Sequence, residues 1–251
     1  MASSSLTPLR IRHPVLHGTS RRLAYALLGL YGATIARAYG ALMWPAYRRT
    51  HPVRRLHLGC SALLRPGWFN TDKYPRRIGV AFCDATGRYP FENDAFDYVF
   101  TEHMIEHVPY AGGKSLVREC LRVLKPGGKL RIATPDLDRI LALRQPTTPL
   151  EKEYVHYALG AIPEVVDGQI SFFINQFIRA WGHTFIYDRE TLSGLMRSAG
   201  FIDVTEWRPG ESNDPDLTGI ERHGETFPNP EFNLIESMVF EGTKPEDCKS
   251  L

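Results

Sequence analysis

The amino-acid sequence predicts an α/β fold built on a mostly parallel sheet with helices on both faces. From residue 53 onward, short apolar runs alternate with helical patterns, and glycine, proline and aspartate residues separate them. Strands that alternate with helices favour parallel pairing, because the helices serve as crossover connections. A length of 251 residues suits one such domain with additions, or two small domains.

Seven extended runs make up the strands of this pattern. We expect strands at residues 53–60, 67–72, 78–84, 95–101, 129–135, 201–207 and 233–243. The expected helices span about 113–124, ending at the stop signal Lys125-Pro126-Gly127-Gly128, about 150–180, with a break near 163–168, and 188–198, with Asp188 as N-cap and Gly200 closing it.

The first 50 residues form a basic extension that differs from the rest. Residues 1–55 contain nine arginines, no lysine and no acidic residue, so the remaining chain carries a formal charge of −7 against a total of +2. An apolar stretch within residues 21–50 is long enough to cross a bilayer but contains Arg37 and Pro45. A helix packed on the domain, a helix in contact with a membrane surface and a targeting segment all fit this stretch.

The four cysteines are widely scattered and form no CxxC pair. This distribution argues against a zinc ribbon and against structural disulfides, and it favours a reducing compartment. We therefore expect a cytoplasmic protein, with peripheral membrane contact as an open alternative.

The segment from Gly59 to Asp72 has the layout of a nucleoside-binding edge. An apolar strand runs into the small residues Gly59-Cys60-Ser61, and the next short strand ends in Asp72. A small-residue turn lets the backbone approach a ligand, and a carboxylate at the following strand tip can accept the ribose hydroxyls. Only thirteen residues separate Gly59 from Asp72, against about 20 in a dinucleotide-binding fingerprint, so a cofactor without phosphates fits better.

Acidic residues close three successive strands: Asp72 the second, Asp84 the third and Glu102 the fourth. In an open α/β sheet, ligands bind outside the carboxyl ends of the strands. We therefore expect these carboxylates to line one ligand crevice.

These pieces, taken as a set, resemble the class I methyltransferases that use S-adenosylmethionine, and among them the type-11 methyltransferase domain. The resemblance rests on LHLGCS, on Asp72, on the run DATGRYPFENDAFDYVFTEHMIEH and on RVLKPGGKLRIATPD, within residues 53–136. It implies a Rossmann-like fold with a seven-stranded sheet, in a methyltransferase domain that spans residues 51–251 after the extension 1–50. Residues 150–230 would then form helices and a loop on the substrate side.

The resemblance also implies roles for individual residues in binding S-adenosylmethionine. Backbone groups of Gly59, Cys60 and Ser61 would approach the methionine part, and Asp72 would accept both ribose hydroxyls. The adenine would be bound by the Asp84 carboxylate and the Ala85 main chain, and Glu102 and His103 would stand near the sulfonium methyl group. Ser61 departs from the family's usual glycine, so the turn must use a negative φ or accept modest strain.

The C-terminal part resembles a branch of methyltransferases often found beside polysaccharide and lipopolysaccharide biosynthesis enzymes. The resemblance is carried by GHTFIYDRETLSGLMRSAGF, GESNDPDLTGIERHG and FNLIESMVFEGTK, and it extends the coverage to about residue 244. It implies an acceptor that is a small molecule or linked to a glycan.

Histidines supply the candidates for proton transfer, which methyl transfer needs only when the nucleophile must lose a proton. We select His103 and His183 as catalytic candidates and interpret His107 as a structural residue. The expected substrate contacts are Tyr187, Glu221, Arg222 and His223, and Arg222 would suit an anionic acceptor. We expect no metal site, because the HMIEH sequence at His103 begins at a strand tip and lacks the zinc-protease spacing.

The leading hypothesis is therefore O- or N-methylation of a small or glycan-linked acceptor with S-adenosylmethionine. A nucleic-acid methyltransferase or binder is one alternative, supported only by the arginine-rich extension, and we expect no nucleic-acid partner. A second alternative is a non-catalytic, membrane-associated module that keeps the fold, for which Ser61 is the main argument.

Overall fold

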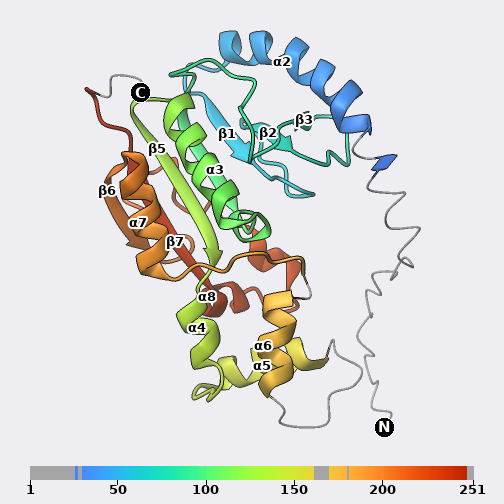
Figure 1. Ribbon diagram of the computed structural model, residues 1–251, viewed down its shortest axis with the longest axis vertical. Coiled ribbons are helices and arrows are strands. Elements are labelled where there is room, and N and C mark those ends of the chain that lie inside the picture. Colours follow the sequence, from blue (N-terminus) through green and yellow to red (C-terminus); the bar gives the residue numbers. More distant parts are fainter. Residues whose placement is uncertain (1–25, 28–29, 161–169, 180, 248–251) are drawn as a thin grey trace, which may run out of the picture.

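The computed structural model describes residues 26–27, 30–160, 170–179 and 181–247 (Figure 1). Seven strands form one sheet in the order β3-β2-β1-β4-β5-β7-β6. Neighbouring strands are parallel except at β7, which runs antiparallel to both β5 and β6. The expected seven-stranded, mostly parallel sheet of the class I methyltransferase fold is thereby confirmed.

Each strand overlaps its predicted run, and five of the seven lie inside it, whereas β4 ends one residue later and β5 begins five residues earlier than predicted. They are β1 (Arg55–Leu58), β2 (Phe69–Asp72), β3 (Ala81–Phe82), β4 (Phe96–Glu102), β5 (Leu124–Pro135), β6 (Ile202–Trp207) and β7 (Ser237–Thr243). The carboxyl ends of β1, β2, β3, β4 and β5 share one edge of the sheet, as parallel pairing requires. This edge carries the predicted glycine turn and the acidic tips.

One face of the sheet is apolar and is covered by helices. α3 (Tyr110–Val123) and α7 (Arg189–Ala199) lie against it side by side, and both contribute to the main hydrophobic core (Figure 1). α7 begins as predicted: the Asp188 side chain accepts a hydrogen bond of 2.7 Å from the Thr191 N–H, and Gly200 ends the helix at φ 111°. The residue at this end must adopt a left-handed conformation, which glycine allows without strain.

The opposite face carries buried polar side chains that pair with residues of segment 208–231. Arg131 of β5 is fully buried there and donates hydrogen bonds to the carboxylates of Glu221 and Glu241. Asp214 of the same segment pairs with Lys129 and accepts from the Tyr98 hydroxyl. Ion pairs and hydrogen bonds therefore take the place of helix packing on this face.

The N-terminal helix α2 (Arg37–Thr50), preceded by the π-helical turn η1 (Gly32–Ala36), packs at the β3 side of the sheet (Figure 1). Trp44 and Tyr47 are buried, and the Trp44 ring contacts Phe69, Phe91 and Phe96. Within the described part of the chain, no helix has the length and apolar character needed to cross a membrane. The packed-helix alternative therefore describes the second half of the apolar stretch at 21–50. Most of the extension before residue 30 lies outside the described residues.

Beyond the carboxyl ends of β4 and β5, short elements build a second, smaller core. The elements of this core are α4 (Leu137–Ala142), α5 (Pro149–Gly160), α6 (Ile170–Arg179) and α8 (Phe232–Glu236), and two short 3-10 turns, η2 (Ile105–His107) and η3 (His223–Thr226), lie in the same part of the fold. Tyr154, Phe173, Phe177 and Phe232 form its centre. The expected break near 163–168 lies outside the described residues.

Two local predictions differ from the structure. Residues 233–236 belong to the helix α8, although the sequence predicts that a strand begins at 233, because Phe232 and Glu236 anchor this turn in the smaller core. The segment Lys125–Gly128 is part of β5, since the main chain of Gly127 and Gly128 pairs with Lys244. In both cases a contact distant in sequence decides the local conformation.

Candidate functional site

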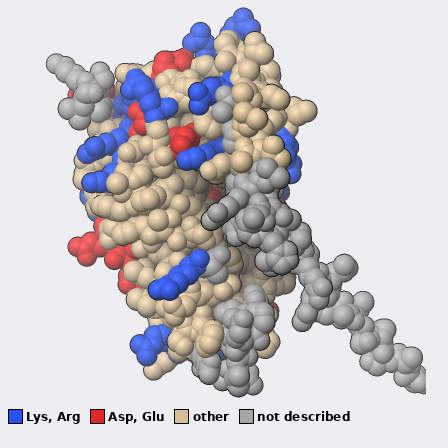
Figure 2. All heavy atoms as spheres, turned by 45° about the vertical axis from the view of Figure 1, so that its right-hand side comes forward, with Lys and Arg blue, Asp and Glu red and all other residues tan. Residues whose placement is uncertain are grey.

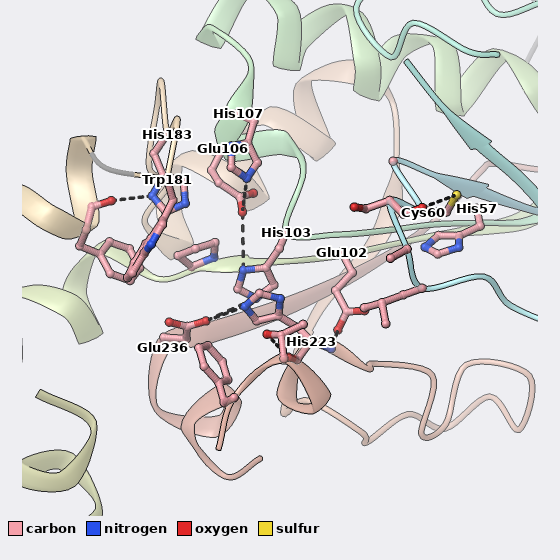
Figure 3. Close-up of a pocket in the computed structure, with 18 of the residues that line it drawn as sticks. His57, Cys60, Glu102, His103, Glu106, His107, Trp181, His183, His223 and Glu236 are labelled. Atoms are coloured by element: carbon pink, nitrogen blue, oxygen red, sulfur yellow. Dashed lines mark hydrogen bonds and ion pairs between the residues drawn. The ribbon is translucent and has the colours of Figure 1, made fainter. Parts of the chain in front are cut away.

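A cavity of about 500 Å³ opens at the carboxyl ends of β1, β4 and β5 (Figure 3). Its lining begins at the glycine turn and continues to the smaller core. The lining residues used below are Gly59, Cys60, Ser61, Glu102, His103, Glu106, His107, His183, His223, Glu236, Tyr157, Phe177, Trp181 and Phe227. One cavity thus joins the expected cofactor region to a group of histidines and aromatic side chains.

We use two names for the parts of this site. The cofactor edge comprises Gly59, Cys60, Ser61, Asp72, Asp84 and Ala85. The histidine end comprises His103, Glu106, His107, His183, His223 and Glu236.

The glycine turn of the cofactor edge has two residues with positive φ, Gly59 at 68° and Ser61 at 45°. A Cβ on Gly59 would lie 2.4 Å from the Met104 Cγ, so glycine is required both by conformation and by packing. Ser61 therefore takes the strained option rather than a negative φ. The Cys60 side chain is buried, and its N–H donates to the Thr71 carbonyl at 3.0 Å, which ties the turn to β2.

Asp72 binds the turn and retains capacity for a ligand. Its Oδ2 accepts from the Ser61 N–H at 2.9 Å and its Oδ1 from the Tyr74 N–H at 2.7 Å. A carboxylate has about four lone-pair sites, so two remain for the hydroxyls of a ribose. The residues of this edge therefore fit the group that the resemblance implies.

Asp84 and the buried Ala85 follow β3. The Asp84 carboxylate accepts from the N–H and hydroxyl of Thr86 and pairs with Lys73 at 2.8 Å. Burial by itself would raise the pKa of Asp84. The hydrogen bonds and the Lys73 charge lower this pKa by a larger amount, so it lies below the usual value. Asp84 is thus held as a carboxylate, as acceptance from an adenine amino group requires.

Glu102 lies at the tip of β4 and joins the C-terminal segment to the sheet. Its Oε1 accepts from the main-chain N–H groups of Arg222 and His223, and its Oε2 lies 3.2 Å from the Arg65 guanidinium. Burial raises its pKa, and these contacts oppose that shift. Glu102 lines the cavity. Its hydrogen bonds to the main chain of Arg222 and His223 also hold segment 221–223 over the site.

His103 follows directly, with an uncommon positive φ of 46° for a non-glycine residue. Its Nε2 lies 2.7 Å from the Ser237 Oγ, and the Ser237 hydroxyl in turn donates to the Asn233 Oδ1 at 2.7 Å. The serine oxygen therefore accepts from Nε2–H, which leaves Nδ1 of His103 as a lone-pair nitrogen. Burial and then the neighbouring histidines lower the pKa of His103, so the ring is neutral.

His223 stacks on His103, with ring centroids 3.5 Å apart and planes 10° from parallel. Its Nε2 lies 3.2 Å from the Glu236 Oε1, and the other oxygen of Glu236 accepts from the Tyr154 hydroxyl. Burial lowers the pKa of His223, but the hydrogen bond and charge of Glu236 more than compensate and raise it. The stacked pair thus combines a neutral ring with one that protonates more readily.

Glu106 is the residue that the sequence reasoning missed. Its side chain is 0 % exposed, its Oε2 accepts from the Thr134 hydroxyl at 3.0 Å, and burial raises its pKa to about 7. Its Oε1 has no hydrogen-bond partner, although His103 Nδ1 and His107 Nε2 lie 3.5 and 3.8 Å away. The spacing in HMIEH was the available signal, because it places two histidines around one glutamate.

His107 and His183 complete the histidine end, with ring centroids 5.0 Å apart (Figure 3). Burial lowers the pKa of both, that of His183 to about 4. His183 lies beside Trp181 and Phe177, and Tyr157 and Phe227 complete the aromatic lining. This part of the cavity offers flat apolar surfaces next to imidazole groups.

The remaining predicted substrate residues lie away from the cavity lining. Tyr187 is fully buried in the main core, with its hydroxyl against Gly113. Glu221 pairs with Arg131 on the polar face, and Arg222 pairs with Glu225 at the surface. The structure therefore brings His103, His183 and His223 together but not the other three.

A family model described as Methyltransferase domain, of type 11, matches residues 69–132. The matched segment runs from β2 into β5 and includes Asp72, Asp84 and the tip of β4. The match thus includes Asp72, Asp84 and Ala85 of the cofactor edge but not its glycine turn. Residues 69–132 of this chain are therefore similar to a methyltransferase domain.

Curated relatives match about half of the chain. A demethylmenaquinone methyltransferase of Clavibacter sepedonicus is 32% identical over 136 residues, which are 51% of this chain and 48% of the relative. The ubiquinone/menaquinone biosynthesis C-methyltransferase UbiE of Bordetella parapertussis is 30% identical over 132 residues, or 51% and 45% of the two chains. The chain thus spans about half the length of these relatives, and their names do not support the expected polysaccharide branch.

Among solved structures, a methyltransferase from Archaeoglobus fulgidus has 18% identity and a TM-score of 0.45, covering 81% of this chain and 94% of its own. One from Thermotoga maritima has 18% identity and a TM-score of 0.42, covering 90% and 96%. The fold assignment itself rests on the strand order of this chain.

Proposed function

We propose that this protein transfers the methyl group of S-adenosylmethionine to a small-molecule acceptor. One observation supports the proposal most strongly: a single cavity extends from the glycine turn of the cofactor edge to the histidine end. A methyl group moves by direct displacement, so donor and acceptor must share one enclosed space in line. The S–CH3 bond breaks as the bond from the acceptor atom to the methyl group forms.

We propose an acceptor with a flat, apolar ring system. Aromatic side chains at Tyr157, Phe177, Trp181 and Phe227 line the acceptor side, and such surfaces bind flat rings by stacking. The relatives named for menaquinone and ubiquinone biosynthesis agree with a ring acceptor. A glycan-linked acceptor, or one methylated on oxygen or nitrogen, remains a prediction from the sequence. The methyl-transfer screen described below tests it as well.

His103 is the first candidate for the group that accepts the acceptor's proton. It follows the last residue of β4. Its Nδ1 carries a lone pair, because the Ser237 oxygen accepts a hydrogen bond from Nε2–H. His183, which lines the same cavity beside Trp181 and Phe177, is the second candidate. Either role applies only to an acceptor atom that must lose a proton.

The described residues around α2 give little support to a nucleic-acid acceptor. On the face drawn in Figure 2, basic and acidic side chains are interspersed near the end that carries α2, and the described residues there form no continuous basic patch. Binding to phosphate backbones depends on such a patch.

Calorimetry with S-adenosylmethionine tests the cofactor part. The native chain should bind one equivalent, and Asp72→Ala should bind at least about 100-fold more weakly, because two hydrogen bonds to a charged group are lost. Asp138→Ala, an exposed carboxylate on α4, is the matched control and should bind normally. No binding to the native chain, or equal binding to Asp72→Ala, would refute the proposal.

A methyl-transfer screen tests the acceptor part. Labelled cofactor is offered with a demethylated naphthoquinol, a sugar nucleotide and RNA, and mass spectrometry locates the methyl group. We expect label in the naphthoquinol. Label in the sugar nucleotide or in RNA instead would contradict the ring-acceptor proposal while leaving the methyltransferase activity in place.

A further inference from the structure

Three side chains of the histidine end converge on one point of the cavity wall. Glu106, His107 and His183 each present one ligand atom, and these three atoms lie within 4.8 Å of one another. Glu106 and His107 belong to the turn η2 after β4, whereas His183 precedes α7, more than 70 residues later. Figure 3 shows the three side chains pointing toward one another from these two segments.

Both imidazoles have one nitrogen held by the main chain and the other directed at the group. The Nδ1 of His183 lies 2.6 Å from the Phe177 carbonyl oxygen, so this nitrogen carries the proton and donates it. The Nδ1 of His107 lies next to Gly182, so its Nε2 is the nitrogen that faces Glu106. Metal-binding histidines typically donate their second N–H to a carbonyl or carboxylate in this way.

The Glu106 carboxylate supplies an independent sign that a ligand is bound here. Its Oε1 is fully buried and has no hydrogen-bond partner. It faces the lone-pair nitrogen of His103 at 3.5 Å and the His107 Nε2 at 3.8 Å. Buried acceptors that face one another are costly unless a proton or a metal cation lies between them, and a cation bound by these side chains removes the cost.

We propose that Glu106, His107 and His183 bind one divalent transition-metal ion, with zinc as the representative case. Two histidines and one carboxylate are a recurrent ligand set of catalytic zinc sites, which keep a further position open. Ligand atoms around tetrahedral zinc lie about 3.4 Å apart, so the group needs to contract by roughly 1 Å. His107 is 38 % exposed and His183 lies in a loop, so both can make this adjustment.

The neighbouring group of His103, His223 and Glu236 meets the same distance criterion but is not our choice. Its groups are already paired: Glu236 with Tyr154 and His223, and His103 with Ser237. Hydrogen bonds inside the protein thus satisfy that group. Only the first group leaves a buried carboxylate oxygen without a partner.

The open position of the proposed ion would face the cavity, because all three ligands line it. If the proposed methyl transfer holds, an acceptor oxygen bound there would lose its proton more readily, since zinc lowers the pKa of bound oxygen ligands. Metal binding itself does not depend on the methyltransferase proposal.

The test uses the full chain, freed of metal with a chelator that is then removed. Calorimetry with zinc chloride should give one equivalent per chain, and magnesium chloride should give none, because magnesium prefers oxygen ligands. Binding should weaken at least about 100-fold in His107→Ala and His183→Ala, and about 10-fold or more in Glu106→Gln. His156→Ala, an exposed histidine on α5, is the matched control and should bind as the native chain does.

Cobalt provides a second readout, since its visible absorption reports nitrogen and oxygen ligands directly. His107→Ala guards against a folding artefact, because this partly exposed side chain can be removed without opening the core. Absence of stoichiometric zinc binding overturns the proposal, as does unchanged binding in the folded His107→Ala and His183→Ala variants. Binding of S-adenosylmethionine by the metal-free chain is measured separately, so failure of the metal site and failure of the methyltransferase proposal are distinguished.

Discussion

The glycine turn of the cofactor edge and the histidine end line one cavity, but the two regions are built in different ways. The cofactor edge comes from one stretch of 27 residues, Gly59 to Ala85, and its carboxylates are held by main-chain N–H groups close in sequence. The histidine end draws on four separate segments, from His103 to Glu236, and its side chains mostly contact one another. A local motif thus builds the cofactor edge, whereas long-range packing assembles the histidine end.

The largest expected effect breaks the local motif at Gly59. In Gly59→Ala, the new Cβ would meet Met104 at 2.4 Å and the residue would keep a φ of 68°. Overpacking and positive φ together should lower the free energy of unfolding by about 2–4 kcal/mol. Urea unfolding measures this change.

The Met104→Ala background is the control for that substitution. In that background, the loss of unfolding free energy caused by Gly59→Ala should be smaller by at least about 1 kcal/mol, because only the conformational penalty remains. Equal costs in the two backgrounds would show that Met104 does not impose glycine at this turn.

The second prediction concerns His57 of β1, which lies beneath the turn. Burial, and then the Arg65 charge, lower its pKa to about 3, against 6.5 when unfolded. Between these values the unfolded chain binds a proton that the folded chain does not, so stability is full above about pH 6.5 and falls as the pH drops. The loss should be about 1.4 kcal/mol per pH unit, or about 2 kcal/mol by pH 5.

His57→Gln removes this titration and serves as the comparison. Between pH 6.5 and pH 5, the unfolding free energy of this variant should fall less steeply than that of the native chain. The two slopes should differ by the contribution of one bound proton. Parallel pH profiles of the two proteins would contradict a buried neutral His57.

The third prediction probes the histidine end through Tyr154, whose hydroxyl donates to the buried Glu236. Tyr154→Phe leaves a carboxylate oxygen with one partner fewer and should cost about 1–3 kcal/mol of stability. Tyr157→Phe, at a neighbouring ring that is 39 % exposed, should cost less than about 0.5 kcal/mol. If both variants unfold at the same urea concentration, the Tyr154–Glu236 contact contributes nothing.

The smallest expected effect is a gain at Ser61. Its φ of 45° is strained for serine, so Ser61→Gly should stabilise the chain by about 0.5 kcal/mol, or about 1–2 °C in melting temperature. Ser198→Gly, inside α7, should have the opposite sign, because glycine is a poorer helix former. A loss of stability in Ser61→Gly would mean that the serine side chain makes a contact worth more than the strain.

Sequence patterns were most reliable where one short segment determines its own structure. The N-cap Asp188 and the closing Gly200 lie as expected, because capping depends on neighbours in the chain. Asp72 and Glu102 end their strands as expected, but of the three acidic tips only Glu102 lines the cavity, whereas Asp72 and Asp84 do not. The prediction of a strand at 233–236 was wrong, because contacts in the smaller core override the extended pattern of this segment. Tyr187 carried a polar signal, yet only the packing against Gly113 reveals that it is enclosed in the main core.

By itself, the sequence determined the order of strands and helices, the glycine turn and the carboxylates of the cofactor edge. These features depend on the period of apolar residues and on the residues at strand ends, which are written locally in the chain. Only the tertiary structure decided which histidines meet around Glu106 and that one oxygen of this carboxylate is buried without a partner. Proximity between residues 106 and 183 is a property of the closed fold, because the sheet edge and the loop before α7 come together only when the helices pack.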